Sequence, residues 1–288
     1  MREVRLNNGV MMPSVGFGVY QIAKSETKQA VLQALEVGYR MIDTAASYFN
    51  EREVGEAIRE SGLPRESVFV TSKLWVQDYE YDDALRGFDR SLSELGLDYI
   101  DLYLLHKPYG NYYAAWRALE RLHKEGRIRA IGVTSFSNER LQDLFLHNEI
   151  KPAVNQIETH PFQQQQDANA FLKAEGIVHE AWTPFAEGQH GIFTNPTLTQ
   201  IGAKYGKTAA QTALRFLMAE NIIAIPKSVH RERLVENLTL DDFDLSAQDL
   251  DAIRALDGGK PLFADLNDPA LAKFLLEYDA KFNPEETF

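Results

Sequence analysis

Side chains suited to proton transfer follow three apolar runs of this 288-residue chain. Asp43, Lys73 and His106 each stand at the end of one run, and Tyr48 follows Asp43 by five positions. Each run has the length and the β-branched or aromatic content of a buried strand, and helical patterns separate the runs. In a barrel of alternating strands and helices, the carboxyl ends of the strands converge on one face, where active sites are built. The sequence therefore predicts that these four side chains meet in space.

These four residue types suit the reduction of a carbonyl group. A tyrosine has a pKa near 10, and an ammonium group within about 4–6 Å lowers that pKa and eases proton delivery. We expect Lys73 to act in this way on Tyr48, and Asp43 to pair with Lys73. His106 could donate a hydrogen bond to the carbonyl oxygen as negative charge grows there. Taken singly, such residues are more often helix caps or packed side chains, so the hypothesis depends on their joint placement.

The elements expected to position these residues alternate regularly along the chain. A short hairpin is expected first, with strands Val4–Leu6 and Val10–Met12 joined by an Asn-Asn-Gly turn. Eight strands are then expected over Val15–Tyr20, Met41–Asp43, Val68–Leu74, Ile100–Leu105, Ile128–Val133, Ala153–Ile157, Val178–Trp182 and Ile222–Ile225. The expected helices span Glu26–Val37, Arg52–Ser61, Tyr81–Leu95, Tyr112–Lys124, Asn138–His147, Gln163–Ala174, Ala209–Ala219, Arg231–Asn237 and Ala247–Leu256.

This alternation predicts an α/β fold, a (β/α)8 TIM barrel with an N-terminal β-hairpin. A barrel of this kind typically takes about 250 residues, so we expect one domain over residues 1–288. Two stretches without a helical or strand pattern are expected to form long loops at the C-terminal face, Phe185–Asn195 and the stretch from Gly258 toward the carboxyl end. Long loops at strand ends are usually functional.

Composition narrows the classes of function. The net charge of −12 disfavours nucleic acid and anionic membranes as partners. The chain has no cysteine, and its seven histidines show no metal-ligand spacing, so no metal site is expected. No apolar stretch approaches the roughly 20 residues that cross a bilayer, and no signal peptide is recognisable, so we expect a cytoplasmic protein.

Several segments resemble the signature segments of the aldo-keto reductase family, and in particular bacterial members similar to 2,5-diketogluconate reductases. They are Asp43-Thr-Ala-Ala-Ser-Tyr48, Thr71-Ser-Lys73-Leu-Trp75, Asp101-Leu-Tyr-Leu-Leu-His106, Ile131-Gly-Val-Thr-Ser-Phe136, Asn155-Gln-Ile-Glu158 and Ile225-Pro-Lys-Ser-Val229. The resemblance implies NADPH-dependent reduction of a small aldehyde or ketone by a monomer. Tyr48 would be the general acid, supported by Lys73 and Asp43, and His106 would orient the carbonyl.

The cofactor has to be held without a Gly-x-Gly-x-x-Gly loop, which the chain lacks. A basic cluster from Lys227 to Arg233 follows the eighth strand and opens a helix, where barrels often bind phosphate. The resemblance implies that Lys227 and Arg233 hold the 2′-phosphate with Ser228, and that Glu236 and Asn237 bind the adenine. The alternative is a solvated helix start whose charges pair locally.

At the nicotinamide end, the resemblance assigns Gln156 and Thr134-Ser135 to the carboxamide and Trp182 to stacking on the ring. The family more often has Ser-Asn at 134 and 135, so Ser135 offers a hydroxyl where an amide is usual. Trp75 and Tyr20 are expected to bind substrate together with His106. Lys107 could contact an acidic substrate, although a lysine at that place more commonly points to solvent.

Two other classes of function remain open from the residues. One is a cofactor-binding regulatory protein, which would bind NADPH without oxidising it. The other is a barrel hydrolase or lyase that uses Asp43 and His106 and does not bind NADPH. Binding and oxidation of NADPH in the presence of a small aldehyde separate the three classes.

Overall fold

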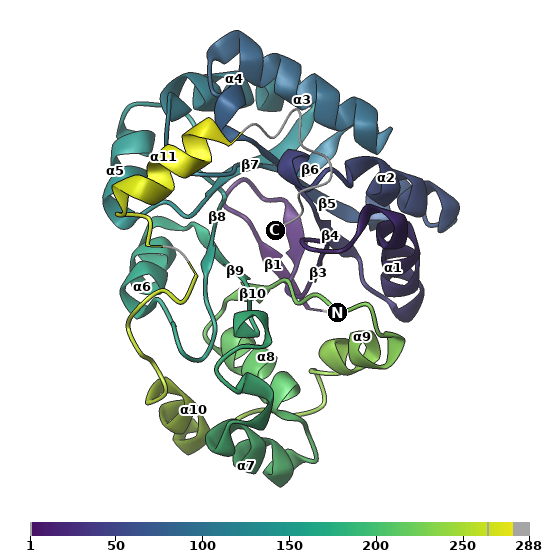
Figure 1. The fold of residues 1–288 in the computed structure, drawn as a ribbon, viewed down its shortest axis with the longest axis vertical. Coiled ribbons are helices and arrows are strands. Elements are labelled where there is room, and N and C mark those ends of the chain that lie inside the picture. The colour runs from purple at the N-terminus through teal and green to yellow at the C-terminus, as the bar shows by residue number, and fades with distance from the viewer. Residues whose placement is uncertain (1, 264, 279–288) are drawn as a thin grey trace.

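The computed structural model describes residues 2–263 and 265–278, in which eight parallel strands form the sheet of a barrel (Figure 1). Each strand from β3 to β10 is hydrogen-bonded to the next in chain order. Their bounds are β3 Phe17–Gly18, β4 Met41–Asp43, β5 Phe69–Leu74, β6 Ile100–Leu105, β7 Ile128–Thr134, β8 Val154–Glu158, β9 Val178–Trp182 and β10 Ile223–Ala224. The ring closes between its first and last strands, because Val15 bridges Ala224 and the Gly16 amide donates to the Ala224 carbonyl at 2.9 Å.

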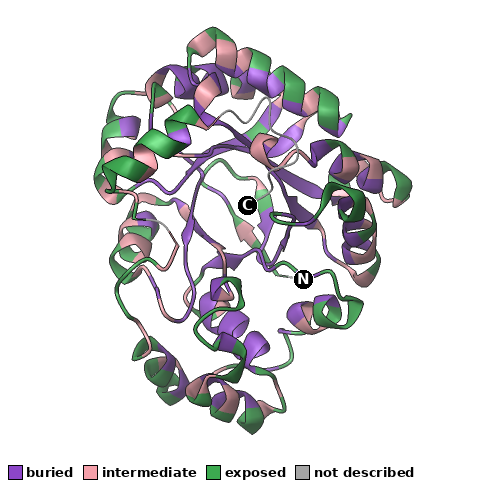
Figure 2. Ribbon diagram, in the orientation of Figure 1, coloured by how far each residue is buried: buried purple, intermediate pink, exposed green. Residues whose placement is uncertain are grey.

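Helices follow the strands and cover the outside of the ring (Figure 1). They are α1 Lys24–Val37, α2 Glu51–Glu60, α3 Tyr81–Leu95, α4 Tyr112–Lys124, α5 Asn138–Leu146, α6 Gln166–Glu175, α7 Pro196–Tyr205, α8 Ala209–Ala219, α9 Arg231–Leu238, α10 Ala247–Arg254 and α11 Pro269–Glu277. The strands are buried along almost their whole length, whereas the helices bury one face and expose the other (Figure 2). The predicted (β/α)8 barrel is confirmed.

The N-terminal hairpin that was predicted from the sequence is present, and it closes one end of the barrel. Strands β1 Glu3–Arg5 and β2 Met11–Pro13 pair antiparallel. The tip is fixed by Asn7 Nδ2, which donates to the Pro152 carbonyl at 2.9 Å. Leu6 and Met12 pack with the inward-facing residues of the strands, among them Met41, Leu102, Leu104, Ala130 and Ile223. The amino-terminal half of the barrel interior is therefore a dry apolar core.

The interior changes character at the carboxyl ends of the strands. Asp43, Lys73, Gln156 and Glu180 are all buried there, on β4, β5, β8 and β9. Charged side chains are almost never fully buried unless they are paired. This polar layer is thus the part of the fold that requires a specific explanation.

Two helices were not predicted from the sequence, α7 and α11. Asn195 caps α7 and Asp268 caps α11, and each cap is followed by a proline in the first turn. Asn-Pro and Asp-Pro are typical of turns, but a capping side chain followed by proline is also a helix start. The predicted C-terminal loop therefore contains a helix, while residue 264 and residues 279–288 lie outside the described part. None of the helices in that part is long and apolar enough to cross a membrane.

Candidate active site

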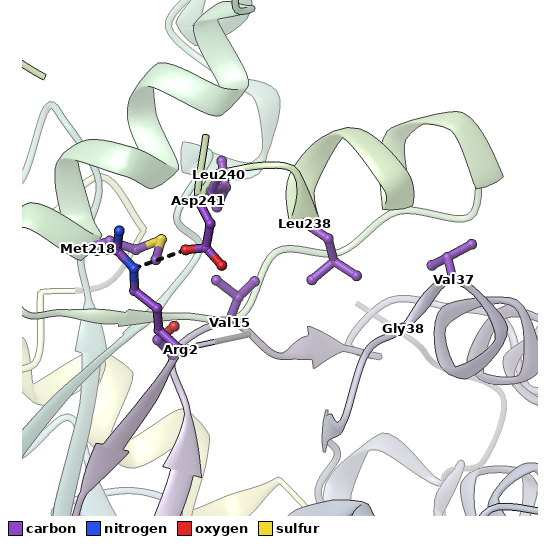
Figure 3. A pocket seen from close by; sticks show the side chains of 9 residues that line it. Arg2, Val15, Val37, Gly38, Met218, Leu238, Leu240 and Asp241 are labelled. Carbon is purple, nitrogen blue, oxygen red and sulfur yellow. Dashed lines mark ion pairs between the residues drawn. The ribbon is translucent and has the colours of Figure 1, made fainter. Parts of the chain in front are cut away.

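The carboxyl ends of the strands surround a cavity of about 570 Å³. Asp43, Tyr48 and His106 line it, together with Lys227 and Arg233. A smaller cavity of about 210 Å³ lies between the ends of α1, α8 and α9 (Figure 3). The 3.0 Å ion pair of Arg2 and Asp241 stands in its wall, and none of the four predicted proton-transfer residues reaches it. The larger cavity is therefore the candidate active site.

A buried ion pair forms the floor of this cavity. Lys73 Nζ lies 2.6 Å from Asp43 Oδ1, and neither side chain is more than 3% exposed. The ammonium also donates to the Thr44 carbonyl at 2.9 Å. Burial lowers the pKa of Lys73, but the charge of Asp43 and that of Tyr48 raise it more, and the net shift is upward. Lys73 is thus a fixed cation at neutral pH.

Tyr48 lies directly above Lys73, on the 3₁₀ turn Ala46–Tyr48 that follows β4. Lys73 Nζ donates to its hydroxyl oxygen at 3.4 Å. Lys73 lowers the pKa of Tyr48, as expected, but burial has the larger effect and raises the pKa of Tyr48 to about 12. The lysine therefore limits the rise in pKa without reversing it.

His106 completes the group, with its ring centroid 5.6 Å from that of Tyr48. Burial, and then the charges of Lys107 and Lys73, hold the pKa of His106 well below its usual value, so the imidazole is neutral. The Ser47 hydroxyl lies 3.2 Å from His106 Nδ1. A second hydroxyl, on Thr134, donates to the His106 carbonyl and fixes the backbone.

Gln156 connects the ion pair to a second buried acid. Its amide nitrogen donates to Asp43 Oδ2 and to Glu180 Oε2, both at 2.9 Å. Burial and the neighbouring Asp43 charge raise the pKa of Glu180 to about 8, so this acid is mostly protonated at neutral pH. Because both amide hydrogens of Gln156 are used, the atom left for a ligand is its carbonyl oxygen, an acceptor.

The other residues predicted for the nicotinamide line the same cavity. Thr134, Ser135 and Trp182 all contribute to its wall. Ser135 has a φ of +62°, a left-handed conformation that asparagine adopts more readily than serine. This backbone geometry gives a physical reason for the asparagine that the family more often has at this position.

Some of the residues predicted for the phosphate and adenine line the cavity, and others do not. Lys227 and Arg233 are exposed and line the cavity. Ser228, Glu236 and Asn237 do not line it. Ser228 Oγ accepts from the His230 amide at 3.1 Å, Glu236 accepts from the Thr208 hydroxyl, and Asn237 is buried and hydrogen-bonded to Tyr39.

The long loop expected over Phe185–Asn195 borders the cavity. Phe185, Glu187, Gly188 and Phe193 line the wall. Glycine-like positive φ values recur here in Thr183, Ala186, Glu187 and His190. Non-glycine residues in this conformation are strained and cluster at functional sites.

The predicted substrate residues pack against Tyr48 and His106. The ring centroid of Tyr20 lies 4.9 Å from that of Tyr48, and the centroid of Trp75 lies 5.2 Å from that of His106. Helix α11 completes this wall, and Trp75 Nε1 donates to the Tyr278 carbonyl at 3.3 Å.

Four contributions to the site were missed or misjudged from the sequence. Ser47 and Glu180 could not be identified from the sequence, because the fold alone brings Ser47 to His106 and Glu180 to Gln156. Lys107 was expected to point to solvent but lines the cavity. The residues of α11 were missed with the helix itself. In the described part of the chain, no group of three or more His, Asp or Glu side chains is arranged to hold a metal.

Comparison with known proteins gives one consistent result. A model of the Aldo/keto reductase family matches residues 9–258. The chain is 46% identical over 255 residues to a glyoxal reductase of Bacillus subtilis (strain 168). The alignment covers 88% of this chain and 92% of that protein. A crystal structure of an aldo-keto reductase enzyme from a Medee basin deep-sea metagenome library is similar with a TM-score of 0.90 and 42% identity, over 92% of this chain and 98% of the other. A Bombyx mori aldo-keto reductase in complex with NADP has a TM-score of 0.87 and 34% identity, over 94% and 96% of the two chains.

Proposed function

Because the chain belongs to the aldo/keto reductase family, we propose that it reduces an aldehyde or ketone to an alcohol with NADPH as the hydride donor. The observation that carries the proposal is the 3.4 Å contact between Lys73 Nζ and the Tyr48 hydroxyl at the floor of the cavity. The proposal covers residues 1–288 as one domain. Of that range, residue 264 and residues 279–288 lie outside the described part of the structure.

The residues along the cavity fit a phosphorylated nicotinamide dinucleotide. Trp182 offers a flat aromatic face, and Gln156 and Ser135 offer hydrogen-bonding groups for a carboxamide. Lys227 and Arg233 supply two exposed cations to the wall of the same cavity. When bound, the dinucleotide would supply a hydride to the carbonyl carbon. Glu236 and Asn237 are assigned to the adenine by family resemblance.

Proton delivery follows from the hydrogen bonds of Lys73. The lysine donates to the oxygen of Tyr48, so the phenolic hydrogen has to point away from Lys73. The proton of Tyr48 would pass to the carbonyl oxygen, which becomes the alcohol. The phenolate left on Tyr48 would be stabilised by the Lys73 ammonium, which Asp43 holds in place.

His106 has a separate role in this proposal. A neutral imidazole can donate one hydrogen bond, and donation to the carbonyl oxygen would orient the substrate and share the developing negative charge. The edge-on packing of Trp75 and Tyr48 against the ring restricts its orientation.

The decisive experiment replaces Tyr48 with phenylalanine. We expect Tyr48→Phe to lower the rate of NADPH oxidation with methylglyoxal or 4-nitrobenzaldehyde by about 10²–10⁴-fold, because the proton donor is lost while the ring remains. The dissociation constant of NADPH, measured by fluorescence, should change less than threefold. Tyr113→Phe on α4 serves as the matched control.

Three outcomes would contradict the proposal in different ways. A Tyr48→Phe rate close to wild type would show that another group delivers the proton. NADPH binding by the wild type without oxidation by any aldehyde would favour the regulatory protein, and failure to bind NADPH would favour the hydrolase or lyase.

The cofactor assignment has its own test at the basic end of the cavity. Arg233→Ala should weaken NADPH about tenfold or more and NADH much less, because only NADPH carries the 2′-phosphate. Arg231→Ala is the control, since Arg231 pairs with Glu36 and does not line the cavity. Equal loss of NADPH and NADH affinity in Arg233→Ala would remove the phosphate assignment.

A further inference from the structure

Lys107 stands in the wall of the cavity immediately after His106. Its backbone is held at both ends by one buried hydroxyl: Tyr79 donates to the Lys107 carbonyl and accepts from the Lys107 amide, both at 3.0 Å. Tyr79 is only 2% exposed, so these two hydrogen bonds lie in the core. The position of Lys107 beside His106 is therefore fixed by the fold.

The Lys107 ammonium has no counter-ion in the described part of the structure, where its Nζ makes no hydrogen bond or ion pair. The acids that line the cavity are Asp43, which is paired with Lys73, and Glu187, which lies near Lys227. Burial and the like charge of Lys73 lower the pKa of Lys107 to about 8. The amine is thus mostly charged at neutral pH and half-buried, and no counter-ion among the described residues neutralises it.

The described cavity residues that pack around Tyr48 and His106 are neutral aromatic side chains. Tyr20 packs against Tyr48, Trp75 against His106, and Tyr278 against Trp75. A single cation on such a wall attracts an anion strongly, because the low dielectric around it weakens screening. The two other lining cations that are not paired, Lys227 and Arg233, belong to the end of the cavity assigned to the cofactor.

We propose that Lys107 makes the enzyme selective for carbonyl substrates that carry a carboxylate. The carbonyl oxygen would meet Tyr48 and His106 while the carboxylate pairs with the Lys107 ammonium and the carbon chain lies on Trp75. This inference rests on the proposed reduction and names the class of substrate that it serves.

A matched pair of aldehydes tests the preference. 4-Carboxybenzaldehyde and methyl 4-formylbenzoate share the ring and the aldehyde and differ in the charge. The wild type should have a kcat/KM at least about tenfold higher for the acid than for the ester, since a charge-assisted hydrogen bond contributes roughly 1.5–3 kcal/mol.

Three substitutions at Lys107 test whether its positive charge causes the preference for the acid. Lys107→Met keeps the length of the side chain and should lower the acid-to-ester ratio about tenfold, chiefly through the KM for the acid, because the lost contact acts equally on bound substrate and transition state. Lys107→Arg should retain the preference, and Lys107→Glu should reverse it. Lys124→Met, an exposed lysine of α4, is the control that should leave the ratio unchanged.

A binding measurement provides a readout without turnover. Benzoate and benzamide can be titrated into the protein while tryptophan fluorescence is followed, since Trp75 and Trp182 line the cavity. Benzoate should bind about tenfold more weakly to Lys107→Met, and benzamide should not. Raising the ionic strength should weaken benzoate binding to the wild type more than benzamide binding.

The outcomes separate this inference from the proposed function. Reduction of the ester without any preference for the acid would leave the proposed function intact and overturn the role of Lys107. An equal loss for both aldehydes in Lys107→Met would also overturn it, because the lysine would then only support the packing. Reduction of neither aldehyde by the wild type would contradict the proposed function for these substrates.

Discussion

His106 is a neutral imidazole with a single N–H group, and its usefulness depends on which nitrogen carries that hydrogen. Only a hydrogen on Nε2 can be donated if Nδ1 faces another partner. Ser47 Oγ lies 3.2 Å from Nδ1, and a hydroxyl can donate to it. Ser47 would then act as a positioning residue that keeps the hydrogen on Nε2.

This role makes Ser47→Ala a specific prediction. Loss of one neutral hydrogen bond should lower kcat/KM for a neutral aldehyde by about 3- to 10-fold, with little change in the affinity for NADPH. The ¹⁵N chemical shifts of the His106 ring should move from a clear Nε2–H form toward a mixture of both tautomers. Ser47→Thr should restore the wild-type spectrum, and an unchanged spectrum in Ser47→Ala would show that Ser47 does not set the tautomer.

At the residue scale, the sequence was informative where a side chain is placed by its position on a strand. Asp43, Lys73 and His106 could be grouped because each follows an apolar run of its own. The pKa of Tyr48 could not be predicted in the same way, because burial depends on every element around the ring. The position of Lys107 could not be predicted either, because it depends on hydrogen bonds between its backbone and Tyr79, which is 28 residues away in the chain.

At the scale of elements, the start of α2 carries a buried acid that the proposed chemistry does not use. Glu51 is the first residue of α2 and accepts a hydrogen bond from Ser72 of β5 at 2.5 Å. Burial raises the pKa of Glu51 to about 7, and the hydrogen bond from Ser72 offsets only part of that rise. Burial between α2 and β5 therefore keeps this carboxyl group protonated up to about neutral pH.

Glu51 should make the stability of the protein depend on pH. Between pH 4.5 and about 7 the folded state retains the proton of Glu51 while the unfolded chain releases it, so the free energy of unfolding falls as the pH rises through this range. Relative to Glu51→Gln, the wild type should lose on the order of 3 kcal/mol between pH 4 and pH 8. Urea denaturation of both proteins at several pH values measures this difference.

The matched control is Glu26→Gln, which removes an exposed glutamate from the first turn of α1. A constant difference between wild type and Glu51→Gln across the pH range would contradict the assignment of a protonated carboxyl to the folded state.

The elements themselves could be predicted where apolar spacing repeats. The strands and most helices follow from such patterns, and their bounds differ from the expected ones by a few residues. Helices α7 and α11 escaped because each starts with a dipeptide that is typical of turns. The expected long loop Phe185–Asn195 contains two 3₁₀ turns, Ala186–Gly188 and Ile192–Thr194, and local spacing in the sequence does not reveal them.

At the scale of the whole molecule, the barrel separates two tasks. The hairpin and the apolar half of the interior stabilise one end, and the polar layer and the cavity occupy the other. The net charge of −12 did not indicate the three cations that are unpaired among the described residues of the cavity wall, because a sum over the chain says nothing about local charge. The positions assigned to the cofactor came from the family resemblance, and the fold brings only some of them to the cavity.

Two separate stretches of the sequence form the wall assigned to the substrate. Trp75 directly follows β5, whereas Leu271, Phe274, Leu275 and Tyr278 lie in a single stretch, in and immediately after α11. Recombination at one site upstream of α11 would therefore exchange half of that wall as a block, while the proton-transfer residues stay in their parental background. New substrate ranges are open to this scaffold through a single crossover.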